Sequence, residues 1–71
     1  MFDNYLTPDQ KRDLLGQRLT QFAAEAYQHQ LNRELGAATG DSQLVANSEA
    51  ALATLTKAIE VHEQELTSLD Q

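Results

Sequence analysis

Two histidines, each close in sequence to a glutamate, are the residues whose types and spacing could do chemistry. Glu25 lies four residues before His29, and His62 lies three residues before Glu65, so each pair would share one face of a helix. Bundles that bind two metal ions use Glu-x-x-His in that order, with further inward-facing glutamates. Neither pair has that order and spacing, and a metal site needs three or four converging ligands. We therefore expect ordinary polar pairs, with no metal and no cofactor.

Nucleophilic catalysis has no recognisable motif in this chain. The serines and threonines are scattered over stretches with helical periodicity, and none of them sits in a strand-turn-helix elbow or a glycine-rich phosphate loop. No nucleophile is placed beside a base at a spacing typical of an activated site. We expect a protein that is not an enzyme.

The second half of the chain carries the clearest pattern, an alternation of three-residue and four-residue steps typical of a coiled-coil seam. Two polar residues, Ser48 and His62, interrupt its d positions. A polar residue in a seam costs stability but can fix register or oligomeric state, and a protonated histidine weakens the packing. Ser48 and His62 are therefore the predicted register-setting or pH-sensitive positions. The whole seam is Val45, Ser48, Leu52, Leu55, Ile59, His62, Leu66 and Leu69.

A capping box predicts where the first helix begins. Thr7 suits the N-cap, Pro8 suits the first helical position, and Gln10 completes a T-x-x-Q motif. Further along, Gly16 indicates either close approach of a second helix or a tolerated surface glycine, and we favour the surface glycine.

A glycine-containing break separates the two helical stretches. Gly36 suits the left-handed cap of the first helix, and Asp41 or Ser42 can cap the second. Because the connection is short, the helices should be antiparallel neighbours. We expect an all-α fold, a coiled-coil-like antiparallel two-helix hairpin in one domain over 1–71. Its parts are a lead over 1–6, a helix over 8–35, a loop over 36–41 and a helix over 42–69.

The first helix has a broader apolar face than the second. Its apolar residues from Leu15 to Ala26 follow the seam spacing, whereas Tyr27, Leu31 and Leu35 step by four and move around the cylinder. A helix with one neighbour needs only a narrow stripe, so this helix should contact more than its partner in the hairpin.

A loop over 36–41 also predicts which levels of the two helices meet. It sets Phe22 near Leu55 and Leu15 near His62, with large and small side chains alternating across the hairpin.

Size and charge limit the possible functions. The chain has 71 residues, no cysteine and a net charge of -6, so a disulfide cannot support its small core. We therefore expect a homodimer in which two hairpins pair into a dimeric four-helix bundle. The negative charge disfavours binding to nucleic acid, and no apolar run has the roughly 18 residues of a membrane span. No secretory signal is visible, which predicts a cytoplasmic location.

The lead over 1–6 is rich in apolar side chains, which either fold back as a lid or anchor the chain to a partner. We expect a non-catalytic interaction or adaptor module that binds itself and an unidentified protein partner. The alternative is an acidic regulatory inhibitor, of antirepressor or DNA-mimic type, that docks on a basic surface. The candidate partner-binding residues are Phe2, Tyr5 and Leu6 in the lead, and Tyr27, Leu31 and Leu35 on the first helix.

Overall fold

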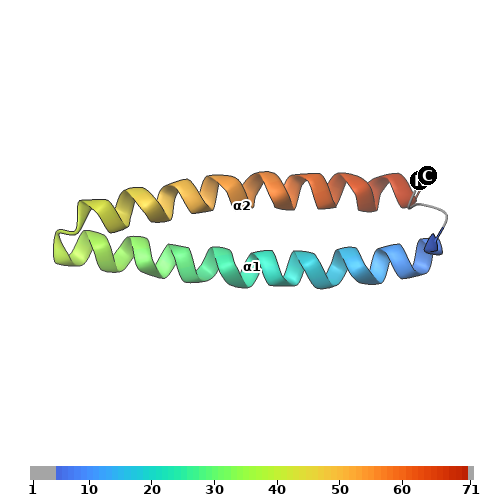
Figure 1. Ribbon diagram of the computed structural model, residues 1–71, viewed down its shortest axis with the longest axis horizontal. Coiled ribbons are helices and arrows are strands. Elements are labelled where there is room, and N and C mark those ends of the chain that lie inside the picture. Colours follow the sequence, from blue (N-terminus) through green and yellow to red (C-terminus); the bar gives the residue numbers. More distant parts are fainter. Residues whose placement is uncertain (1–4, 71) are drawn as a thin grey trace.

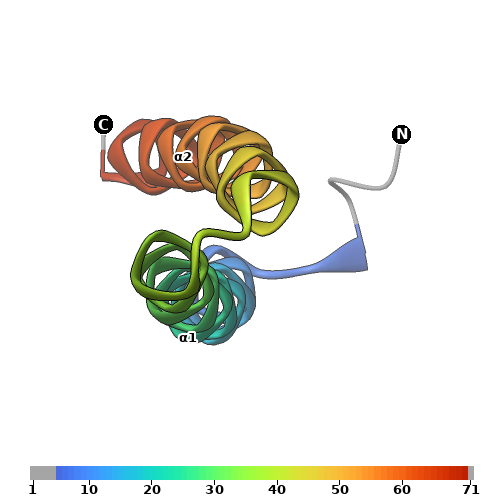
Figure 2. The ribbon, with the colours of Figure 1, turned by 90° about the vertical axis from the view of Figure 1, so that its left-hand side faces the viewer.

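The computed structural model describes residues 5–70, which form two long helices. Helix α1 spans Pro8–Thr39 and helix α2 spans Ser42–Leu69. The helices run antiparallel and side by side, joined at one end by a tight turn (Figures 1 and 2). The molecule is elongated, with extents of 50 × 19 × 15 Å. The predicted all-α helical hairpin is confirmed. No helix within residues 5–70 is long and apolar enough to cross a membrane.

Helix α1 begins where the capping box predicts. The Thr7 hydroxyl accepts a hydrogen bond from the Gln10 backbone N–H at 3.1 Å, and the Gln10 side-chain oxygen accepts one from the Thr7 N–H at 2.9 Å. Pro8 occupies the first turn, where its missing N–H leaves no bond unmade. Local sequence chemistry therefore determines this end of the helix.

The end of α1 differs from the prediction. The helix continues four residues past 35 to Thr39, and Gly40, at φ 74°, provides the left-handed cap that was expected at Gly36. Gly36 is buried inside the helix, and its carbonyl accepts the Asp41 N–H at 2.8 Å. The loop over 36–41 is therefore reduced to Gly40 and Asp41, because alanines continue the helix after Gly36.

The longer helix changes the register of the hairpin. The His62 ring lies against Phe22, with ring centroids 4.9 Å apart, whereas the predicted levels set Phe22 near Leu55 and His62 near Leu15. At the turn, Gly36 lies beside Val45. The predicted pairing was wrong because the predicted loop was four residues too long. With the shorter connection, each residue of α1 faces a position of α2 closer to the C-terminus than predicted.

The seam of α2 follows the predicted heptads. All eight of its positions are buried or half-buried. Among residues 5–70, Leu55 is the one hydrophobic side chain classed as buried, at 9% exposed, and Ser48 is more deeply covered at 2%. The remaining seam residues keep part of their surface in contact with water.

The facing seam of α1 is less apolar. It also advances in steps of three and four, but it includes two arginines and a histidine that an apolar pattern could not reveal. Its buried or half-buried members are Arg12, Leu15, Leu19, Phe22, Ala26, His29, Arg33 and Gly36.

Candidate functional site

A cluster around His62 joins the two helices. The Arg18 Nε–H donates to His62 Nε2 at 3.0 Å, and the Arg18 guanidinium carbon lies 5.4 Å from the centroid of the Phe22 ring. The Phe22 and His62 rings meet edge to face at an interplanar angle of 77°, a geometry that aromatic pairs favour. On the other side of the imidazole, Nδ1 lies 2.7 Å from the Ala58 carbonyl oxygen.

These contacts assign the tautomer of the neutral His62 ring. An arginine is always a donor, so Nε2 must accept and the ring hydrogen must lie on Nδ1, where it is donated to Ala58. With both nitrogens engaged inside the chain, the neutral ring has no lone pair left for a metal ion or a substrate. Arg18 is thus a specific partner for the polar seam position at His62, and the register-setting or pH-sensitive role of that position stays a prediction.

Within the described residues, the other histidine has no such partner. His29 is half-buried in the seam of α1. Within residues 5–70, no three histidine, aspartate or glutamate side chains come together in a group that could hold a metal ion. The structure therefore does not assemble the Glu25 and His29 pair, or the His62 and Glu65 pair, into a larger ligand set.

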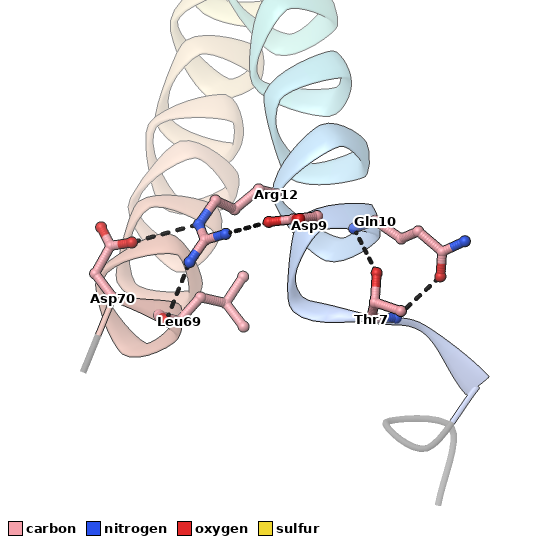
Figure 3. A network of polar contacts seen from close by, with 6 residues as sticks. All are labelled: Thr7, Asp9, Gln10, Arg12, Leu69 and Asp70. Atoms are coloured by element: carbon pink, nitrogen blue, oxygen red, sulfur yellow. Dashed lines mark hydrogen bonds and ion pairs between the residues drawn. The ribbon is translucent and has the colours of Figure 1, made fainter.

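Arg12 links the helices at the open end of the hairpin (Figure 3). Its Nη1 lies 2.8 Å from an Asp9 carboxylate oxygen, its Nε lies 3.4 Å from an Asp70 carboxylate oxygen, and its Nη2 lies 3.4 Å from the Leu69 carbonyl oxygen. Both aspartates are well exposed, so each ion pair contributes about 0–1 kcal/mol. The contact with Leu69 also satisfies a carbonyl at the end of α2. This network joins the start of α1 to the end of α2, which is a structural role.

An apolar stripe runs along the side of α1 that faces away from α2. Tyr27, Leu31 and Leu35 are 62%, 46% and 55% exposed. Exposed alanines extend the stripe in both directions. The outer stripe is Ala24, Tyr27, Leu31, Leu35 and Ala38.

The polarity of α1 is inverted over this stretch. At the levels where Tyr27, Leu31 and Leu35 point outward, the seam residues His29 and Arg33 face α2. A helix that packs only against its hairpin partner places apolar residues inside and polar residues outside. The second half of α1 therefore directs its larger apolar side chains away from α2.

The structure describes two of the three predicted lead residues. Phe2 lies outside the described residues. Tyr5 is 79% exposed and Leu6 is 40% exposed, and their role stays a prediction. Leu14 and Val61 are also exposed apolar side chains that were not predicted. Their heptad positions, which lie away from both seams, could have identified them.

A hollow beside the turn is shallow and open. It has a volume of about 320 Å³ and is bordered mainly by small residues near Gly36 and Val45. Glu49 and Ser42 supply its polar groups, which is too few to orient a small ligand.

No protein-family model, curated protein or solved structure matches this chain. Any function therefore has to be inferred from the surface of the chain itself. The outer stripe of α1 is an apolar part of that surface that packing between α1 and α2 does not require.

Proposed function

We propose that this chain is a non-catalytic interaction or adaptor module that acts as a homodimeric helical hairpin. The observation that carries the proposal is the outer stripe of α1, where Tyr27, Leu31 and Leu35 lie exposed on the side away from α2. Burying one such side chain is worth about 1.5–3 kcal/mol. The hairpin itself does not gain this free energy, so a partner that covers the stripe would.

The thin core supports the homodimer. Most seam residues are only half-buried, and the chain exposes 5412 Å². A compact protein of 7.9 kDa exposes about 4,400 Å². A second hairpin that completes a dimeric four-helix bundle would cover part of the difference of about 1,000 Å².

Sedimentation equilibrium at micromolar concentration tests the homodimer. We expect a mass twice the chain mass of 7.9 kDa, and a melting temperature that rises with protein concentration. A helical monomer that unfolds cooperatively at a concentration-independent temperature would contradict the proposal.

A second candidate function uses the acidic surface of α2. Exposed Glu60 and Glu63 border an open groove, and Glu65 is also exposed. An ion pair joins Lys57 to Glu60 at 3.5 Å. An acidic regulatory inhibitor of antirepressor or DNA-mimic type would place these carboxylates in a basic site of its target.

Salt separates the two candidate functions. Once a partner has been isolated from the native host, its binding is measured in low salt and at about 1 M salt. Persistence at high salt supports an apolar contact between the hairpin and its partner. Loss at high salt supports docking of the acidic surface on a basic partner.

A further inference from the structure

The outer stripe is symmetric about Leu31. Tyr27 and Leu35 lie four residues to either side of it, and Ala24 and Ala38 lie seven residues to either side. All five residues are exposed on one side of α1. Reversing the helix therefore leaves an apolar residue at each position of the stripe.

We propose that the outer stripe is the surface on which a second copy of this chain docks, with the two α1 helices antiparallel about a two-fold axis at Leu31. The proposal rests on the homodimer proposed above and names its contact face. Leu31 then meets Leu31 of the second copy, each Tyr27 meets a Leu35, and each Ala24 meets an Ala38. A two-fold interface has to be complementary to itself, and the symmetric spacing meets that requirement.

The charges also favour a second copy. At a net charge of -6, two chains repel each other unless they meet through a neutral face. The outward positions of α1 from Thr20 to Ala38 carry one charged residue, Glu34. In the antiparallel arrangement Glu34 lies at the level of the uncharged Gln28 of the second copy. The two copies of Glu34 are six residue levels apart, about 9 Å along the helix axis.

The elongated hairpin exposes enough surface in total for an interface of ordinary size. A standard interface buries about 800 Å² on each partner. The hairpin exposes 5412 Å², about 1,000 Å² more than a compact chain of its mass. Docking through α1 places the two α1 helices at the centre of the assembly and the two α2 helices on the outside, so this contact covers the outer stripe and leaves the seam between α1 and α2 as it is in the single hairpin.

A matched pair of substitutions tests the contact face. Leu31 and Leu14 are both on α1 and are 46% and 47% exposed, but Leu14 lies outside the outer stripe. We expect Leu31→Lys to be monomeric in sedimentation equilibrium, with its helical circular dichroism retained, and Leu14→Lys to remain dimeric like the wild type. A dimer that survives Leu31→Lys, or that is lost in Leu14→Lys alone, overturns the proposal.

A cysteine placed on the axis gives an independent readout. The chain has no cysteine, so Leu31→Cys introduces a single thiol that should meet its own counterpart and form a disulfide-linked dimer on mild oxidation. Leu14→Cys, the control, should remain uncrosslinked. A dimer that crosslinks through position 14 and not 31 refutes this contact face while the homodimer stands. A wild-type chain that is monomeric refutes both.

Discussion

Two glycines of α1 allow a prediction in which one substitution has opposite effects at two sites. At Gly36, an added Cβ would lie 2.9 Å from the Val45 Cγ2 methyl, 3.0 Å from the Asp41 carbonyl oxygen and 3.1 Å from the Val45 nitrogen. At Gly16, no atom lies within 4 Å of the added Cβ, which confirms that Gly16 is a tolerated surface glycine. Gly16→Ala and Gly36→Ala therefore add the same methyl group to an open site and to a closed one.

The backbone at Gly36 leaves little room for adjustment. The Val45 N–H donates to the Asp41 carbonyl oxygen at 3.2 Å, so the two backbone atoms nearest the new methyl belong to the same turn at the start of α2. Relief of the contact requires α2 to move away from α1. Overpacking of this kind typically costs about 1–3 kcal/mol.

The expected magnitudes follow from two terms. Replacing a helical glycine by alanine gains about 1 kcal/mol at either site, and the packing cost applies only to Gly36→Ala. Gly16→Ala should therefore stabilise the protein by up to about 1 kcal/mol, a rise in melting temperature of about 4–8 °C for a chain of this size. Gly36→Ala should melt at least about 4 °C below Gly16→Ala, because the propensity term is common to both.

Thermal unfolding followed by far-ultraviolet circular dichroism measures both variants against the wild type at one chain concentration. Equal concentration matters because a dimer melts higher as its concentration rises. A melting temperature of Gly36→Ala equal to that of Gly16→Ala would refute the close approach of the helices at the turn.

Three further predictions concern the cap, the seam and the histidine cluster. Thr7→Ala should destabilise the protein by about 1 kcal/mol in urea denaturation, because the capping box is lost, and Thr7→Ser should not. Ser48→Leu should cost about 1–3 kcal/mol because the site is filled, whereas Ser48→Ala should change little. Arg18→Ala should destabilise the protein by about 0.5–1.5 kcal/mol in urea denaturation, because His62 Nε2 loses its hydrogen-bond donor. Equal stability of wild type and Arg18→Ala would contradict the contact between Arg18 and His62.

The sequence predicted the features that depend on a few neighbouring residues or on a pattern repeated along one helix. The capping box at Thr7 is complete within four residues, and it was read correctly. The heptads that begin at Val45 repeat over the whole of α2, and they too were read correctly. The end of α1 was wrong because a glycine near a helix end is usually its cap, whereas Gly36 is helical and its missing side chain admits Val45. The role of Gly36 depends on its contact with α2, and the sequence around Gly36 does not reveal that contact.

The register error had the same origin. The contacts of His62 with Arg18 and Phe22 depend on the loop length, since each residue removed from the loop changes which levels face each other. Sequence spacing alone placed His62 in the seam but could not give its neighbours. Arg18 lies beside the α1 seam and would have been recognised as a partner only after the two-residue turn at Gly40 and Asp41 was known.

The inverted polarity of α1 is the strongest reason to look outside the hairpin. Exchanging the environments of Leu31 and Arg33 would bury a leucine against α2 and expose an arginine, and an isolated hairpin would gain stability from that exchange. The chain instead has Arg33 half-buried in the seam and Leu31 exposed. In the sequence, the four-residue steps through Leu31 read as one apolar face drifting around α1. In the structure they are a second face, separate from the seam, and a second copy docked on that face would bury the leucine that the hairpin leaves in water.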